Sequence, residues 1–301
     1  MKHVTIHLLS LATMLLAGCC NCPKPSEPVN VATWPMSRVV ERINANNRKI
    51  PSLWATHNYE ADVVDEKHHS HHVSGAGKLL YMPSNSMRLT GDAVVGTVFD
   101  IGSNANTYWL KLGAEAGDTM WWGKWSDFAN INPDHMGIPI RPDMVLDVLG
   151  VSTIDTNFNV LPAPIMRFDN KADSYVFTWV GKLPDRWVGV REIWYKRETL
   201  RPWLVRVYDM NGRVVMRGEL SRYRQVLVPD QPKTQWPWMP GNYVLSFPDS
   251  GSRMVFTLDD ARLYLITEAG RKVPNPKTFR MPPPGAAGVD HVIQIGGQAG
   301  E

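Results

Sequence analysis

Apolar and polar residues follow two different patterns of spacing along this chain. Near the start, Met36, Val39, Val40 and Ile43 recur at spacings of three and four, which predicts a helix over residues 34–46. Further along, the rhythm changes to short runs rich in Val, Tyr, Trp and Thr, separated by clusters of Gly, Pro, Asn and Asp. This second pattern predicts successive antiparallel β-strands.

The predicted strands fall into two groups on either side of a second helix. The first group covers residues 53–65, 77–82, 86–93, 95–101, 107–112 and 119–125. Residues 141–149 have a proline near their first turn and then an apolar face, which predicts a short helix. The second group covers residues 175–181, 187–196, 203–209, 214–226, 243–247, 254–258 and 261–266. Asn211-Gly212 in this group predicts a hairpin turn.

These elements predict a mainly β domain built on one long meandering sheet of roughly ten to thirteen strands. A sheet of that length curls, and the chain offers few helices to cover its concave side. We therefore expect a cavity or groove that a helix partly fills, an architecture suited to an apolar ligand.

The N-terminal apolar run, residues 6–16, is too short to span a bilayer. It ends in Leu16-Ala17-Gly18-Cys19, which resembles the lipobox of bacterial lipoproteins. We expect residues 1–18 to be a signal peptide and Cys19 to carry the lipid anchor; ordinary secretion is the alternative. Prolines then predict a flexible tether over residues 19–33, a domain over 34–280 follows, and a Pro- and Gly-rich flexible tail covers 281–301.

Composition narrows the chemistry. All 3 cysteines precede the domain, so it has neither disulfides nor thiolate metal sites. The formal net charge of +3 is spread along the chain, which argues against nucleic acid as a partner. The sequence contains no Gly-x-Ser-x-Gly elbow and no Gly-rich phosphate loop. We therefore expect a protein that is not an enzyme and needs no cofactor.

A histidine run is the strongest candidate for metal chemistry. It consists of His68, His69, His71 and His72, and imidazoles at this spacing bind zinc, copper or nickel. The run stands beside charged residues where two predicted strands turn. A solvated hairpin loop explains it without a metal, so a metal site is the minor hypothesis.

The aromatic residues suggest how a lipid would be held. Many of the 12 tryptophans alternate with polar residues, so they should share one side of the sheet, and Trp121 and Trp122 must point to opposite sides. We expect most to be core residues, and we expect a few rings to face the cavity: Phe99, Trp109 and Trp194. Arg88 and Arg191 are candidates for contact with an anionic headgroup at the rim.

Three stretches carry a resemblance to a known family: LYMPSNSMRL at 80–89, VFDIGSN at 98–104 and YWL at 108–110. They resemble the outer-membrane lipoprotein-sorting superfamily of LolA-like and LolB-like carriers. The order of elements over residues 34–266 is also similar. The resemblance implies an unclosed antiparallel β-barrel wrapped around one to three helices, which binds lipid or the acyl chains of lipoproteins without catalysis.

The sequence thus predicts an envelope lipoprotein, held in the outer membrane and facing the periplasm, that binds lipid or lipoprotein acyl chains in sorting or lipid transport. Cys20 follows the anchor in place of an acidic residue, which favours the outer membrane. Two alternatives stay open. One is a scaffold with a plugged cavity that binds other envelope proteins, and the other is a metal-binding envelope protein that uses the histidine run.

Overall fold

The computed structural model describes residues 32–64, 68–94, 96–113, 118–127, 142–229, 231–286 and 288–296. Residues from Trp34 onward form a compact unit of their own. The expected signal peptide, Cys19 and nearly all of the expected tether lie outside the described residues. Within the described ranges, no helix combines the length and the apolar character that crossing a bilayer requires.

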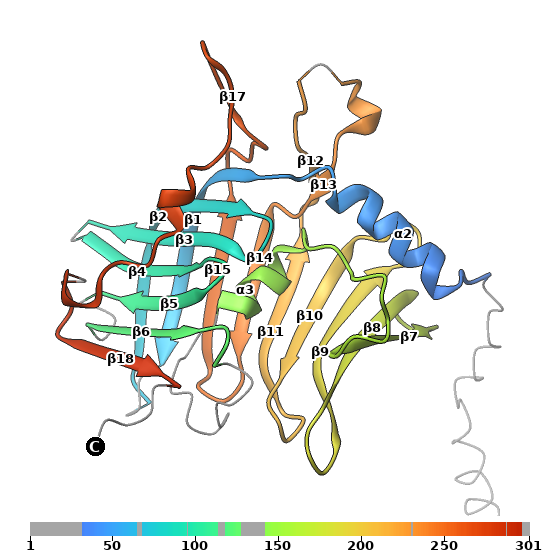
Figure 1. Cartoon of the computed structure of the whole chain (residues 1–301), viewed down its shortest axis with the longest axis horizontal. Coiled ribbons are helices and arrows are strands. Elements are labelled where there is room, and N and C mark those ends of the chain that lie inside the picture. The colour runs from blue at the N-terminus through green and yellow to red at the C-terminus, as the bar shows by residue number, and fades with distance from the viewer. Residues whose placement is uncertain are drawn as a thin grey trace, which may run out of the picture. The chain divides into compact units, whose positions relative to one another are not determined.

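Fourteen strands form one sheet in this unit (Figure 1). A first meander contains β1 (Leu53–Val64), β2 (Ser70–Met82), β3 (Ser86–Ala93), β4 (Gly96–Ser103), β5 (Thr107–Leu112) and β6 (Thr119–Lys124). A second group contains β7 (Ala163–Asp169), β8 (Ser174–Lys182), β9 (Trp187–Lys196), β10 (Pro202–Tyr208), β11 (Val214–Ser221), β14 (Asn242–Phe247) and β15 (Ser252–Leu258). The sheet is long, curved and not closed, so the predicted fold class is confirmed.

The two groups join where β1 pairs with β15, in a register that sets His57 opposite Leu258. The strand order is therefore β18-β6-β5-β4-β3-β2-β1-β15-β14-β11-β10-β9-β8-β7. The smaller elements are β12 (Arg224–Gln225) with β13 (Trp238–Met239), β16 (Leu265–Thr267) with β17 (Gly270–Lys272), and three 3-10 turns at Lys233–Gln235, Pro276–Phe279 and Pro284–Ala286.

Some boundaries differ from the sequence prediction. The single strand expected over 214–226 breaks at Arg222, whose φ of 52° lies in the left-handed region. The strand expected over 261–266 is reduced to β16 and one bridge between Trp54 and Arg262. The tail expected over 281–301 adds a strand, β18 (His291–Ile295), which runs parallel to β6. Its backbone there gains ladder hydrogen bonds that composition alone does not predict.

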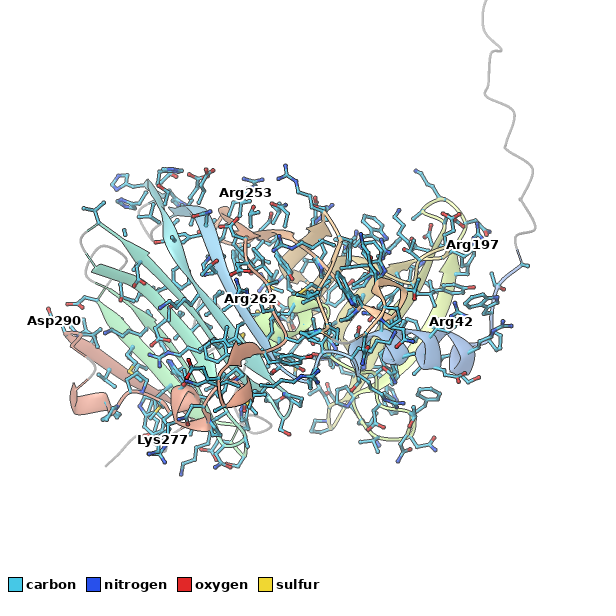
Figure 2. All side chains as sticks on the ribbon, turned by 90° about the horizontal axis from the view of Figure 1, so that it is seen from above. Arg42, Arg197, Arg253, Arg262, Lys277 and Asp290 are labelled. Carbon is cyan, nitrogen blue, oxygen red and sulfur yellow. The ribbon has the colours of Figure 1, made fainter. Side chains whose placement is uncertain are left out.

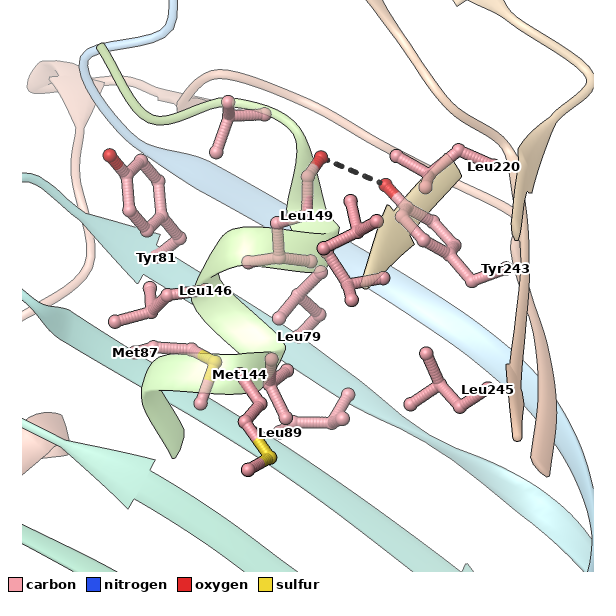
Figure 3. Close-up of a cluster of buried hydrophobic side chains, with 14 of the residues drawn as sticks. Leu79, Tyr81, Met87, Leu89, Met144, Leu146, Leu149, Leu220, Tyr243 and Leu245 are labelled. Atoms are coloured by element: carbon pink, nitrogen blue, oxygen red, sulfur yellow. Dashed lines mark hydrogen bonds between the residues drawn. The ribbon is translucent and has the colours of Figure 1, made fainter. Parts of the chain in front are cut away.

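Helix α3 (Pro142–Leu149) lies against the sheet between its two halves (Figure 3). It is apolar on nearly every side, since Met144, Val145, Leu146, Val148 and Leu149 are all buried. Figure 3 shows their neighbours from both meanders, which are Leu79, Tyr81, Met87 and Leu89 on one side and Leu220, Tyr243 and Leu245 on the other. The Tyr243 hydroxyl donates to the Leu149 carbonyl at 3.5 Å. We call the helix-bearing face of the sheet the inner face.

Helix α2 (Met36–Asn47) packs on the same core through Val39, Val40 and Ile43. Its buried Asn44 makes two hydrogen bonds of 2.8 Å with the backbone of Ile154, donating to the carbonyl and accepting from the amide. A buried amide paired in this way costs little to desolvate and fixes the helix along the segment after α3.

The outer face, opposite the helices, has its own buried patches. Trp109 and Met120 form one, with Trp122, Met281 and Val289 packed against them. Val176, Trp194 and Leu204 form another. Trp121 packs on the inner core whereas Trp122 packs outside, so the opposite orientation expected for this pair is confirmed. The C-terminal segment, drawn in red in Figure 1, therefore covers part of the first meander.

Candidate functional site: an apolar cavity on the inner face

An apolar cavity lies between β1, β2, β4, β5 and the β14–β15 hairpin. Its empty volume is about 740 Å³, the space at its mouth included. The apolar side chains that line it are Tyr59, Ala61, Val63, Val73, Val98, Phe99, Ile101, Leu110, Leu112, Phe247 and Met254. Most of them stand two residues apart on a strand, which places them on one face.

A β-bulge gives this cavity two neighbouring side chains from one strand. In the β3–β4 register, Gly91 pairs with Phe99 and Asp92 with Thr97, so Val98 is the extra residue. Bulges re-aim side chains in this way. Val98 and Phe99 consequently both line the cavity, although neighbours on a regular strand point to opposite faces.

Gly91 makes room for the Phe99 ring. A Cβ atom at position 91 would lie 2.2 Å from the ring atom Cε1 of Phe99. The Phe99 ring also meets Tyr59 edge to face, with the ring centres 5.0 Å apart. The wall of the cavity is therefore held by aromatic packing and by the absence of a side chain on the neighbouring strand.

The few polar residues of the cavity lie where β1 ends and β15 begins. They are Asp62, Arg253, Ser250 and Ser252, and Figure 2 labels Arg253 there. The serines have partners within the protein: the Ser252 hydroxyl accepts from the Val64 amide at 3.0 Å, and the Ser250 hydroxyl donates to the Phe247 carbonyl at 3.4 Å. Val63 beside them is 37 % exposed. The cavity thus has an apolar interior and a polar rim.

His57 is buried on β1, two residues before Tyr59 of the cavity wall. Its Nε2 lies 3.0 Å from the Thr90 carbonyl, which can only accept, so the proton lies on Nε2. Its Nδ1 is buried without a hydrogen-bond partner. Burial lowers the pKa of His57 below its ordinary value of 6.5, and the bond to Thr90 opposes that change only in part.

This pKa shift predicts a loss of stability in acid. Because the folded state holds His57 neutral, the unfolded chain binds more protons as the pH falls through 6.5 toward the lowered pKa. The contribution of His57 to stability is complete above pH 6.5 and declines over that window. We expect His57→Gln, which keeps a donor toward Thr90, to flatten this part of the profile of unfolding free energy against pH. Equal profiles for the two proteins, measured by urea unfolding, would contradict the assignment.

The structure places the three candidate cavity rings in different surroundings. Phe99 lines the cavity, and its contact with a ligand stays a prediction. Trp109 lies on the outer face over Gly102 and beneath the C-terminal segment, and Trp194 lies on the outer face with Trp203. The prediction that these two tryptophans face the cavity is therefore corrected. Both faces of these strands are buried, so an apolar residue does not reveal which face it occupies.

The two candidate headgroup arginines also have protein partners. Arg88 lies on the outer face, where its guanidinium binds Asp100 at 2.8 Å and donates to the Thr278 carbonyl at 3.1 Å. Arg191 points inward and binds Asp147 of α3. Neither residue lines the cavity, because each guanidinium is held by a carboxylate on a neighbouring element.

The histidine run is not a loop throughout. β2 begins at Ser70, so His71 and His72 lie within a strand and project to opposite faces. His72 Nδ1 lies 2.8 Å from the Asp62 carboxylate on β1. Within the described ranges, no group of three or more His, Cys, Asp or Glu side chains is placed to hold a metal ion. The expectation of a hairpin loop is corrected for this part of the run.

Sequence reasoning missed most of the cavity wall. Tyr59, Ala61 and Val63 occupy alternate positions of β1, and Leu110 and Leu112 do the same on β5. This period of two was the available signal, but it marks every inner-face residue of the sheet. Which of those residues face empty space depends on where α3 lies, and this follows only from the assembled fold.

Comparison with known proteins supports the fold. No family profile matches the sequence, and no curated protein is significantly similar to it. Among solved structures, a LolA superfamily protein from Nitrosomonas europaea is similar with a TM-score of 0.50 and 11% identity, over 83% of this chain and 99% of that one. An outer membrane lipoprotein-sorting protein domain from Vibrio parahaemolyticus gives a TM-score of 0.48 and 15% identity, over 75% and 91%. The likeness to the Nitrosomonas europaea structure confirms the resemblance in fold that the sequence predicted.

Proposed function

Proceeding from this likeness to the LolA superfamily, we propose that the chain is a non-catalytic envelope protein that binds lipid or lipoprotein acyl chains in its apolar cavity. The observation that carries the proposal is the cavity itself, whose wall is aliphatic and aromatic and whose polar groups are confined to the rim. A saturated chain needs such a wall and no hydrogen bonds. The likeness in fold to a LolA superfamily protein supports the same class of ligand.

The energetics favour a chain-like ligand. Each buried methylene contributes about 0.8 kcal/mol before ordering costs, so the affinity rises with the number of acyl carbons that the cavity encloses. A rigid polar ligand would leave its hydrogen-bonding groups unpaired against this wall. We infer that the acyl chain of the ligand enters past Val63 and that its headgroup stays at the rim near Asp62 and Arg253.

Membrane attachment through Cys19 completes the proposal. Two or three acyl chains on that residue would hold the unit firmly at a bilayer, whereas one chain binds only marginally. Placement in the outer membrane and a part in sorting or lipid transport rest on the lipobox and on the likeness in fold. Cys19 lies outside the described residues, so its lipidation stays a prediction.

A second candidate function is the scaffold with a filled interior. It is favoured by one observation, namely that α3 occupies much of the inner face and is itself buried on nearly all sides. In that case the remaining cavity would be a packing defect, and other envelope proteins would bind elsewhere on the molecule.

Bound lipid distinguishes the two functions. Residues 23–301 are suitable, since every core cluster lies between Val39 and Ile295. We expect lipid to co-purify in stoichiometric amount and to be lost in Val98→Asp, because a carboxylate would face the apolar wall. Native mass spectrometry and mass spectrometry of organic extracts measure this, followed by uptake of added palmitate or lipopeptide.

Two further variants control this experiment. Val94→Asp changes a fully exposed residue just before β4 and should keep the ligand. Ala61→Phe fills the cavity without adding charge and should displace the ligand even if Val98→Asp unfolds the protein. Repeated absence of lipid, with no uptake by the unmodified chain, would favour the scaffold.

A further inference from the structure

A second cavity, whose lining mixes charged and polar side chains with apolar ones and which we call the polar cavity, lies where α2 ends. It is lined by the last turns of α2, by Gly150 after α3, by the turn between β9 and β10, by Tyr223 and by Trp238 of β13. Its empty volume is about 750 Å³, the space at its mouth included. It shares no lining residue with the apolar cavity. The proposed function makes no use of it.

Arg201 is the central charged group of this polar cavity. Its guanidinium carbon lies 3.6 Å from the ring centre of Trp238 and 5.6 Å from that of Tyr223. Stacking of this kind uses the faces of a guanidinium and leaves the N–H groups on its edge free to donate. Burial lowers the pKa of Arg201, which is consistent with a cation that has lost water without gaining a carboxylate.

The position of Arg201 is fixed by the surrounding backbone. The Asn46 side chain of α2 bonds to both backbone polar groups of Trp238, accepting from its amide at 2.8 Å and donating to its carbonyl at 3.0 Å. The turn before Arg201 places Leu200 at a φ of 52°, and the Leu200 amide donates to the Lys196 carbonyl at 2.8 Å. The backbone that carries the Trp238 ring and the Arg201 side chain is therefore held in place before any ligand arrives.

A second guanidinium, that of Arg42, lines the same cavity. Arg42 also stacks on the Trp34 ring, 5.2 Å from its centre. Across the ranges that the structure describes, neither Arg42 nor Arg201 forms an ion pair with a carboxylate. Glu198 is the one acidic residue among those that line the cavity, and it is exposed. Figure 2 labels Arg42 on α2, well apart from Arg253 at the rim of the apolar cavity.

We propose that this polar cavity binds a phosphate group through Arg201 and Arg42. Two guanidiniums offer forks of N–H donors that match the oxygens of a phosphate, which presents more acceptor oxygens than a single carboxylate does. The two amide side chains that line the cavity already have hydrogen-bond partners within the protein, since Asn46 donates to the Trp238 carbonyl and Asn47 donates to the Ser152 carbonyl at 2.7 Å. The phosphate belongs either to a soluble compound or to a lipid headgroup.

Titration of residues 23–301 with inorganic phosphate, followed by calorimetry, tests the site. We expect one phosphate to bind per chain, at least about tenfold more weakly in Arg201→Gln and Arg42→Gln, because each loses charge-assisted hydrogen bonds. Arg201→Lys keeps the charge but loses the fork of N–H donors. Its affinity for phosphate should therefore lie between those of the unmodified chain and of Arg201→Gln. Arg217→Gln is the matched control, since Arg217 pairs with Glu219 on β11 and lies outside the cavity.

One variant protects the test against misfolding. Glu198→Gln removes the acidic residue from the lining without touching Arg201, so it should tighten phosphate binding by about twofold to threefold, as expected for one exposed charge. Absence of phosphate binding to the unmodified chain, or equal affinities in Arg201→Gln and Arg217→Gln, would overturn the proposal. Neither result bears on lipid in the apolar cavity, because the two sites share no residue.

Vesicles identify the source of the phosphate. Retention on vesicles that contain phosphatidylglycerol in phosphatidylcholine, but not on phosphatidylcholine alone, would assign the cavity to an anionic headgroup if Arg201→Gln abolishes it and Arg217→Gln does not. Binding of inorganic phosphate without such retention would assign it to a soluble phosphate compound. Retention that survives Arg201→Gln, together with no binding of inorganic phosphate, would contradict the site.

Discussion

Replacing Asp147 by alanine is expected to lower the free energy of unfolding by about 3 kcal/mol, because it removes the carboxylate that pairs with the largely buried Arg191 guanidinium. Asp147 on α3 forms an ion pair with Arg191 on β9, and the Asp147 side chain is only 12% exposed. The Arg191 guanidinium lies 4.4 Å from the Trp179 ring centre, and its Nε is already buried without a partner. Urea unfolding followed by circular dichroism measures the change.

A double variant separates this pair from general damage to the helix. Asp147→Leu with Arg191→Met replaces the ion pair by apolar groups and should recover most of the lost stability. Asp185→Ala is the control, since Asp185 and Arg186 form an exposed pair that contributes at most about 0.5 kcal/mol. A cost below about 1 kcal/mol for Asp147→Ala would show that water, rather than Asp147, compensates Arg191.

Replacing Trp109 by alanine is expected to cost about 4 kcal/mol, within the range for deleting a fully buried tryptophan. Trp109 has no exposed surface and donates from Nε1 to the Asp100 carboxylate at 3.4 Å. Met281 and Val289 of the C-terminal segment pack on the same patch. The variant should therefore both weaken the fold and release that segment.

Two measurements separate these effects. Unfolding in urea gives the total cost, and Trp187→Ala, at a residue that is 60% exposed, should change it by less than about 0.5 kcal/mol. Amide hydrogen exchange over residues 291–295 reports the segment, because these residues pair with β6. Unchanged protection of those amides in Trp109→Ala would contradict the idea that Trp109 anchors the segment.

The missed elements share a cause. β7 begins with Ala163-Pro164, and a proline within such a run of residues argues against predicting a strand there. Its place at the edge of the sheet tolerates that proline, but edge and centre are not distinguishable from one sequence. β18 pairs with a strand more than 160 residues earlier in the chain, and nothing local in residues 291–295 records that partner.

The sequence by itself determined much of the secondary structure of this protein. Alternation over β3, β5 and β9 predicted their limits to the residue, and the apolar run after Pro142 predicted α3, because backbone geometry converts a period of two or 3.6 into a strand or a helix. The open, curved sheet was predicted from the order of those elements, whereas the resemblance to lipoprotein-sorting carriers was carried by the motifs at residues 80–89, 98–104 and 108–110.

Only the tertiary structure decided which face each side chain serves. Phe99 and Trp109 are equally apolar and lie on neighbouring strands, yet one lines the inner cavity and the other lies under the C-terminal segment. Arg191 became a structural residue because α3 brings Asp147 to it from 44 positions away. Periodicity fixes which residues share a face, whereas burial, charge pairing and empty space depend on what the folded chain packs against that face.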